Sequence, residues 1–570
     1  MATPWNIRGS ASQLFFQDKT SSEYQALVAI ADIPHPDRSM LGSFINDACD
    51  PEEAARYFLH MTGIGDGSKA PPVKTISQFL SEWKFLVKKF RPTSETSLSN
   101  ETKMHIYERD GGYCCITRTP FKSYLDRNLE YVHIVPLHVF TDPDLAEGTS
   151  LFEMLSRFLS RELLEVACSS AYKQLETLDN LWLLSTQVFN VVEKGVLFLT
   201  AQSWRNDPDV PEKQIYNIHT NLFKPQRYAC LYRLRHEIKL VNRTPQITPS
   251  LSVKLVDIHA RFSKSLVWLE TKEYMDATVD GAQGRGLYPS SLVSPFSSLL
   301  RKLWISIPPF VRASVYDILL RIGFRIYGRT LSMTVFKLPF GLYLRRGAPA
   351  SAPKYHVEAH TLQMIEQSTH IPAPRAIDVL ETPRFSYLLM TCVPGRPIGQ
   401  VMDAMSDEQV KQAVNDLKNY ILELREIRNN TGEFRICNSQ GGGILDWRIP
   451  DSQREELRFR SEDDFNKYLT HLFVEEIRKR AAKSHDTHHE IFFTHGDLNP
   501  RNILAENGRI SGIVDWENAG WFPEYWEYTK AHYSVRSLRR WLADFIDEVF
   551  EGYREELLVE NMLSDLLGPY

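Results

Sequence analysis

The stretch FFTHGDLNPRNIL, followed closely by ISGIVDW, is the feature that most constrains what this chain can fold into. Two short apolar runs, at 492–493 and 503–504, enclose a polar loop that carries Asp497 and Asn502, and a β-branched run ends at Asp515. We interpret the stretch as a loop, a strand, a turn at AENGR and a second strand. The resulting hairpin would bring Asn502 and Asp515 together at one end.

The spacing of these polar residues indicates a particular chemistry. Asn502 and Asp515 supply two oxygen ligands, a set that suits Mg²⁺ shared between a protein and substrate phosphates. Asp497 lies on the same loop and is free to accept a proton from a hydroxyl nucleophile, as in phosphoryl transfer of the protein-kinase type. The alternative is a polar loop that caps a hairpin, in which Asp and Asn are only turn residues.

HGDLNPRN and IVDWENAGWFPEYWEY resemble the aminoglycoside phosphotransferase and choline-kinase-like superfamily, most of all its large fungal branch. Upstream, VFKLPFGLYLRRG resembles that branch's nucleotide-binding hairpin, and YLLMTCVPGRPIG resembles its interlobe hinge. The resemblance covers about residues 303–555. It implies a bilobal protein-kinase-like fold over 303–570 that transfers phosphate from ATP, with Mg²⁺, to a hydroxyl of a small molecule.

The resemblance also implies roles for single residues. Asp497 would be the catalytic base, Asn502 and Asp515 would be the metal ligands, and His495 would brace the loop. Backbone groups from Thr391 to Val393 would meet the adenine of ATP.

One position departs from the family's pattern. Glu358 falls at the place of the helix C glutamate of kinases, whose usual partner is a Lys, but this sequence reads LYLRR and has Arg345 there. Arginine keeps the charge but is longer and planar. Arg345 would hold either the α- and β-phosphates of ATP or Glu358 alone, and both alternatives stay open.

The region after Asp515 is rich in acidic and aromatic residues. These could hold a cationic acceptor through carboxylate and cation–π contacts, although the tryptophans also lie near helical spacing and fit a core equally well. The residues concerned are Glu517, Glu524, Glu527, Trp516, Trp521 and Trp526.

The middle of the chain shows a second resemblance. YERDGGYCCITRTPF, EYVHIVPLHVF and DNLWLLST resemble the fungal HNH (His-Me finger) nuclease domain, which implies a ββα unit over 96–245. His133 matches the histidine that activates water, and Asn180 matches the asparagine that fixes the hairpin. The metal-binding histidine should fall at 188–190, where the sequence reads Val-Phe-Asn. We therefore expect a degenerate unit, in which His133 is a buried structural residue.

Charge also argues against a metal-dependent nuclease. Residues 101–240 hold 16 Lys and Arg against 18 Asp and Glu, a net charge of −2, whereas phosphate-binding domains usually carry a basic bias. The whole chain has a net charge of −5, so we expect no nucleic-acid partner. A non-catalytic protein that uses both enzyme-like units as scaffolds is the remaining alternative to a phosphotransferase.

The remaining features set the organisation and the compartment. We expect a multidomain α+β protein: an N-terminal region at 1–95, the HNH-like unit, a linker at 246–302 interrupted by one helical stretch, and the kinase-like unit.

The seven cysteines form no C-x-x-C pair, and no basic-then-apolar leader begins the chain, so we expect the cytoplasm or nucleus. LLRKLWISIPPFVRASVYDILLRIGF is too interrupted by charges and prolines to span a bilayer, and we expect no membrane partner. The oligomeric state stays open.

Overall fold

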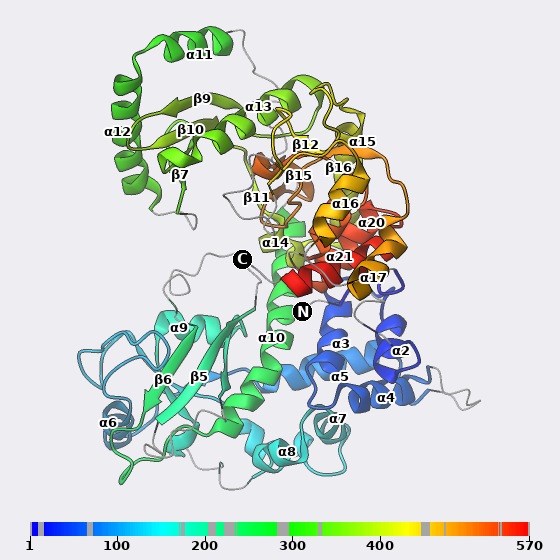
Figure 1. Ribbon diagram of the computed structural model, residues 1–570. Coiled ribbons are helices and arrows are strands. Elements are labelled where there is room, and N and C mark those ends of the chain that lie inside the picture. The colour runs from blue at the N-terminus through cyan, green and yellow to red at the C-terminus, as the bar shows by residue number, and fades with distance from the viewer. Residues whose placement is uncertain are drawn as a thin grey trace. The chain divides into compact units, whose positions relative to one another are not determined.

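The computed structural model describes most of the chain, namely residues 3–9, 16, 18–64, 72–169, 172, 177–202, 213–221, 234, 236–281, 296–328, 333–445, 457–471, 475–533, 535 and 538–567. The chain divides into two compact units, 1–283 and 284–570 (Figure 1). Each unit is described by itself. No helix within the described ranges is both long enough and apolar enough to cross a bilayer.

Unit 1 begins with a group of helices: α2 (Ser22–Ala29), α3 (Asp37–Asn46), α4 (Pro51–Thr62) and α5 (Ile76–Lys89). Local sequence signals fix their starts. The Asp50 side chain accepts the N–H of Glu53 at the start of α4, and Pro51 occupies the first helical position, which removes a donor that the helix could not use. On α5, Phe79 and Trp83 are buried against the preceding helices.

The helix α10 (Val253–Gly281) changes the boundary expected from the sequence. We expected a linker over 246–302 that contains a helical stretch, but Leu255, Phe262 and Leu266 of α10 are buried. Phe262 stacks on Phe90 with ring centroids 4.1 Å apart, so this helix is part of the core of unit 1. Residues 282–295, which hold the Gly- and Ser-rich part of the expected linker, lie outside the described residues.

Two small antiparallel sheets complete unit 1, with strand orders β1-β2-β3 and β4-β5-β6. β3 leads directly into α9 (Thr186–Val192), so an antiparallel pair and a helix follow each other there. The strands are β1 (Thr93–Ser94), β2 (Leu129–His133), β3 (Leu181–Ser185), β4 (Leu197–Ala201), β5 (Lys213–Thr220) and β6 (Glu237–Val241). The other helices are α6 (Asn100–Arg109), α7 (Ser150–Phe158) and α8 (Arg161–Ala167).

The first half of unit 2 is a four-stranded antiparallel sheet covered by helices (Figure 1). The strands run in the order β7 (Val335–Leu338), β8 (Leu342–Gly347), β10 (Ser386–Thr391) and β9 (Ala376–Glu381). The helices are α11 (Phe296–Ser306), α12 (Pro309–Tyr327) and α13 (Ala352–Ser368). Tyr316 and Leu320 of α12 join Leu338, Leu344 and Leu389 of the sheet in one core, because α12 presents an apolar side chain to the sheet at each turn.

The second half of unit 2 is mainly helical and holds two small sheets, β11-β14-β15 and β12-β16-β13. The helices are α14 (Ile398–Val401), α15 (Asp407–Glu426), α16 (Glu462–Thr470), α17 (Glu475–His485), α18 (Trp526–Tyr533), α19 (Arg539–Trp541), α20 (Asp547–Val549) and α21 (Arg554–Leu567). The strands are β11 (Arg396–Pro397), β12 (Cys437–Asn438), β13 (Ile491–Thr494), β14 (Ile503–Glu506), β15 (Arg509–Ile513) and β16 (Gly520–Pro523).

A buried histidine connects three segments of this half. His489 lies between two carboxylates, with Nδ1 2.7 Å from Oε1 of Glu462 in α16 and Nε2 3.3 Å from Oε1 of Glu556 in α21. Burial by itself would lower the pKa of His489, but the two carboxylates raise it to about 9. The ring is therefore charged at neutral pH and binds the two helices to the start of β13.

We expect this cluster to make stability depend on pH. Because the pKa of His489 is raised in the folded state, its contribution is complete below the unfolded value of about 6.5 and is lost as the pH rises through about 9. The loss should approach about 3 kcal/mol. Urea unfolding at pH 6 and pH 10 should show His489→Gln destabilised relative to the wild type at the lower pH only.

His471→Gln supplies the control, because His471 is exposed and its Nδ1 contacts the Tyr468 carbonyl rather than a carboxylate. A wild-type advantage over His489→Gln that stays the same at both pH values would contradict the assignment.

Candidate functional site

The hairpin predicted from the sequence is present in unit 2. β14 and β15 pair antiparallel with Ile503 opposite Ile513. Asn507 and Gly508 connect them with positive φ values of 52° and 78°, the geometry of a tight hairpin turn. Beyond the strands, the Val514 N–H donates to the Asn502 carbonyl over 2.9 Å. Asn502 and Asp515 are therefore held at the same end of the hairpin.

Asn502 is bonded to Asp497 in a way that orients its oxygen. Its Nδ2 donates to Oδ2 of Asp497 over 2.9 Å and to the Asp497 carbonyl over 3.0 Å. Within the described ranges, Oδ1 of Asn502 accepts no hydrogen bond, and it is not one of the fully buried side-chain atoms that lack a partner. This oxygen is therefore open to solvent and available to a cation. Oxygen donors from Asn502 and Asp515 fit Mg²⁺.

Asp497 is the one carboxylate of this loop, and its side chain is mostly covered. Burial raises the pKa of Asp497 to about 6, against the opposing effect of Arg501, whose Nη2 lies 3.4 Å from Oδ2. The Arg501 side chain is mostly exposed, whereas that of Asp497 is mostly covered. A carboxylate with a pKa near the working pH is well suited to exchange a proton with a substrate.

His495 connects the loop to the hairpin. Its Nδ1 accepts the N–H of Asp497 over 3.2 Å, and its Nε2 therefore donates to the Val514 carbonyl, 3.1 Å away. Burial lowers the pKa of His495 to about 4, so the ring is neutral. It contacts the Trp516 ring edge-on, with the two ring centroids 4.6 Å apart. These partners fix the tautomer and tie the segment before Asp497 to the segment before Asp515.

Glu527 of α18 binds the backbone of the same loop, a role that the sequence did not indicate. It accepts the N–H of His495 over 2.6 Å and the N–H of Gly496 over 3.1 Å. Burial raises the pKa of Glu527 to about 7. Gly496 has φ +77°, and a Cβ there would meet the Asn518 carbonyl at 2.5 Å, so the loop requires glycine at this position.

The structure corrects the role expected for the acidic, aromatic region after Asp515. We considered Glu527 as a contact for a cationic acceptor, but it is buried under the loop, and Glu524 accepts the Tyr553 hydroxyl over 2.8 Å. Trp516, Trp521 and Trp526 are all buried, as the alternative of a core role predicted. One sequence signal could have indicated that Glu527 is buried. It follows a tryptophan directly in WEYTKAH, a stretch that forms a mostly buried helix.

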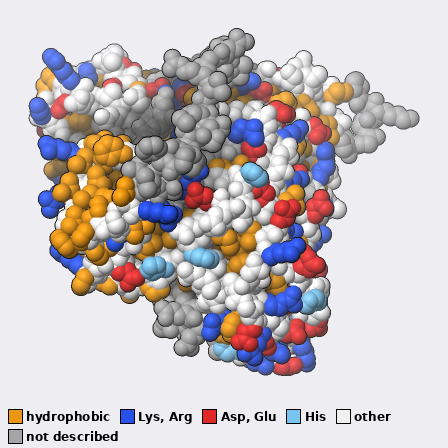
Figure 2. Space-filling view, turned by 90° about the horizontal axis from the view of Figure 1, so that it is seen from above, with side chains coloured by type: hydrophobic (Ala, Val, Ile, Leu, Met, Phe, Trp, Pro, Cys, Tyr) orange, Lys and Arg blue, Asp and Glu red, His pale blue; other side chains and the backbone are white. Residues whose placement is uncertain are grey.

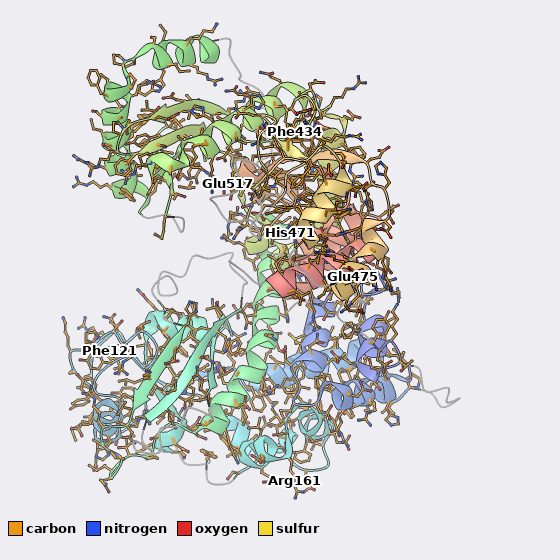
Figure 3. The ribbon with its side chains drawn as sticks, viewed as in Figure 1. Phe121, Arg161, Phe434, His471, Glu475 and Glu517 are labelled. Carbon is orange, nitrogen blue, oxygen red and sulfur yellow. The ribbon has the colours of Figure 1, made fainter. Side chains whose placement is uncertain are left out.

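Arg345 of β8 lies among three carboxylates. Its Nη1 is 3.0 Å from Oε2 of Glu358 in α13 and 2.8 Å from Oε2 of Glu517, and its Nη2 pairs with Oδ1 of Asp515. Glu517 lies at the border between the two halves of unit 2 (Figure 3). The sequence suggested Glu358 as a partner of Arg345, but it did not place Asp515 or Glu517 beside it.

The charges of this group are strongly coupled. Burial raises the pKa of Glu358 to about 7, and Arg345 opposes the rise. For Arg345, burial favours the neutral form, but the three carboxylates outweigh it and raise the pKa above its ordinary value. One guanidinium faces three acids, so the group keeps an excess of negative charge beside Asp515, which favours a divalent cation there.

In the segment expected to meet adenine, most backbone N–H groups already donate hydrogen bonds within the protein. The Thr391 N–H donates to the Arg375 carbonyl over 3.0 Å, and the Cys392 N–H donates to the Gly341 carbonyl over 2.7 Å. The Val393 N–H has no hydrogen-bond partner among the residues that the structure describes. Of the three amides, that of Val393 is the one left for a ligand.

His133 and Asn180 belong to unit 1. The Asn180 side chain accepts the Val135 N–H over 3.0 Å and donates to the Val135 carbonyl over 2.8 Å, which fastens the segments after β2 and before β3. His133, at the end of β2, is 1% exposed, so its ring does not reach solvent. Positions 188–190 lie on α9.

Comparisons with known proteins agree with the geometry of unit 2. Residues 338–559 match the family described as Phosphotransferase enzyme family. Two aminoglycoside 3'-phosphotransferases from Escherichia coli are 24% and 23% identical over 185 residues, which cover 32% of this chain and 65% of each relative. The family match falls in the second half of the chain, and the chain spans 65% of the length of these curated relatives.

Solved structures give weaker matches. Aminoglycoside phosphotransferase APH(3'')-Id from Streptomyces rimosus ATCC10970 is 16% identical over 44% of this chain and 97% of that chain, with a TM-score of 0.29. Macrolide 2'-phosphotransferase MphH from Brachybacterium faecium is 14% identical over 43% of this chain and 88% of that chain, with a TM-score of 0.29.

Proposed function

We propose that unit 2 is an ATP-dependent phosphotransferase that transfers a phosphoryl group to a hydroxyl of a small molecule. The observation that carries the proposal is the arrangement of three residues at one end of the hairpin. Asn502 donates to Asp497 and turns a free oxygen outward, and the hairpin register holds Asp515 at the same end. The match to the phosphotransferase family over 338–559 supports it.

In this proposal each residue has a separate role. Asn502 and Asp515 would hold Mg²⁺, which lowers the negative charge on the phosphates when it is bound with ATP. Asp497 would accept the proton of the acceptor hydroxyl. His495 and Glu527 contact the loop and keep Asp497 in place, and the Val393 amide would meet the adenine.

Two other assignments fit the structure less well. A scaffold without activity is the first alternative, because the charge of Arg345 is paired with carboxylates of the protein itself. Binding of MgATP distinguishes this scaffold from an ATP-dependent enzyme. For unit 1 we propose a degenerate HNH-like fold that does not cleave nucleic acid, because His133 is buried and α9 carries no histidine at 188–190.

We expect the full-length chain to bind ATP only together with a divalent cation. Asn502 and Asp515 offer oxygens, which are poor partners for phosphate without a cation between them. At a hundredfold excess of MgATP over its Kd, unit 2 should gain about 2.7 kcal/mol of stability, measured as a rise in its thermal transition.

ATP with a chelator is the control for this experiment. Asn502→Ala should remove the rise, while the exposed substitution Asp486→Asn should keep it. An unchanged transition with saturating MgATP would rule out nucleotide binding and leave the scaffold alternative.

A further inference from the structure

The hairpin of helices α11 and α12 carries a second apolar surface that the proposed function does not use. The first apolar face of α12 packs on the sheet through Tyr316 and Leu320. On the other side, Phe310 is 72% exposed, Ile318 54% and Ile326 59%. A helix that is apolar on both sides normally has partners on both sides.

The surface is continuous and large. The outer stripe of α12 follows helical spacing from Phe310 and Val311 through Ile318 and Ile322 to Ile326, and the exposed Leu303 and Ile305 of α11 add to it. Figure 2 shows hydrophobic side chains gathered on the side of the molecule where Figure 1 draws α12, with Lys and Arg at the edge. Exposed apolar patches of this kind mark interaction sites.

The charges around the surface identify the partner. Residues 296–327 hold five Lys or Arg and one Asp, although the whole chain has a net charge of −5. One of the five, Arg312, is buried and pairs with Asp378, so it adds no charge to the surface. Lys302, Arg321 and Arg325 are exposed, and none of them has a carboxylate partner among the described residues. The single acid, Asp317, lies 3.5 Å from Arg346. An apolar stripe bordered by unpaired cations is complementary to an anionic lipid surface.

We propose that the outer face of α11 and α12 docks on an anionic phospholipid membrane, with the apolar stripe in the acyl boundary and the cations at the headgroups. A second copy of this chain is a poorer occupant, because a symmetric contact would bring the exposed Lys302, Arg321 and Arg325 of one copy against the same cations of the other. The docking is peripheral, since no described helix is able to cross a bilayer. It revises the sequence-based expectation of no membrane partner, which concerned a segment that spans the bilayer. The active-site residues lie elsewhere in unit 2, so docking is independent of the proposed function.

Vesicle co-sedimentation of the full-length protein tests this. The protein should bind vesicles of phosphatidylcholine with phosphatidylserine, bind vesicles of phosphatidylcholine alone much less, and be released by added salt. Arg321→Gln and Arg325→Gln should each lower the partition coefficient about fivefold. Ile318→Glu should lower it further, because it places a charge within the apolar stripe.

Two matched substitutions on α15 and α16 complete the test. Leu422→Glu changes an equally exposed apolar residue, and Lys467→Gln removes an exposed cation, so both should bind like the wild type. Circular dichroism and MgATP binding should be unchanged in every variant. Absence of vesicle binding, or equal binding by Ile318→Glu, would overturn the proposal. Self-association that Ile318→Glu abolishes, without lipid binding, would identify a protein interface instead.

Discussion

Asp497→Asn is expected to lower the rate of ADP formation by about a thousandfold, the typical contribution of a general base. The asparagine keeps the shape of the side chain and its contact with Asn502, but it cannot accept a proton. MgATP affinity should stay nearly unchanged, because the nucleotide is assigned to Asn502 and Asp515. Steady-state kinetics with a panel of hydroxyl acceptors, or with water as the acceptor, measures the rate, and calorimetry measures the affinity.

The result separates two roles for Asp497. Loss of rate alone supports the proton acceptor, since an interaction made only in the transition state lowers kcat without weakening ground-state binding. An equal loss of MgATP affinity would show instead that Asp497 is a metal ligand. Asp486→Asn, an exposed change on the same half of unit 2, should leave both quantities at the wild-type value.

Arg345→Ala is expected to destabilise unit 2 by about 3–5 kcal/mol, the cost of leaving buried carboxylates without their cation. Glu358 is 1% exposed, so its burial keeps solvent from taking the place of the guanidinium. Urea unfolding monitored by tryptophan fluorescence measures the loss. Arg345→Lys should recover most of the stability, because it restores the charge, although its single ammonium cannot bridge Glu358 and Glu517 in the planar way of a guanidinium.

Nucleotide binding by the same variants distinguishes the two alternatives for Arg345. If Arg345 reaches the phosphates, Arg345→Lys should keep or improve MgATP affinity and turnover. If it serves only the carboxylates that surround it, Arg345→Lys should change stability but not affinity. Arg346→Ala is the matched control, because Arg346 follows on the same strand and contacts the Phe385 ring instead. Full stability of Arg345→Ala would contradict the ion-pair cluster.

The hairpin could be predicted from the sequence because its determinants are local. Ile503 pairs with Ile513 across a turn whose Asn507-Gly508 pair favours positive φ. The register of so short a hairpin fixes Asn502 and Asp515 at one end without any distant contact. The contact between Asp497 and Asn502, five residues apart, is equally local.

The buried or exposed state of the remaining site residues was decided by tertiary packing. Glu527 lies 31 residues after Gly496, and only the packing of α18 under the loop makes it accept backbone N–H groups rather than face a ligand. Arg345 and Glu517 are 172 residues apart. The length and composition of the intervening chain do not determine such a contact, because the position of one element on another depends on the whole core.

The same distinction applies to the rest of the chain. The sequence by itself determined a helical stretch within 253–270, since its apolar spacing is a local property, but the burial of Phe262 against Phe90 depends on residues far apart in sequence. That Tyr316 faces the sheet while Ile318 faces outward was decided by the tertiary structure, because both sides of α12 are apolar and the sheet covers only one of them.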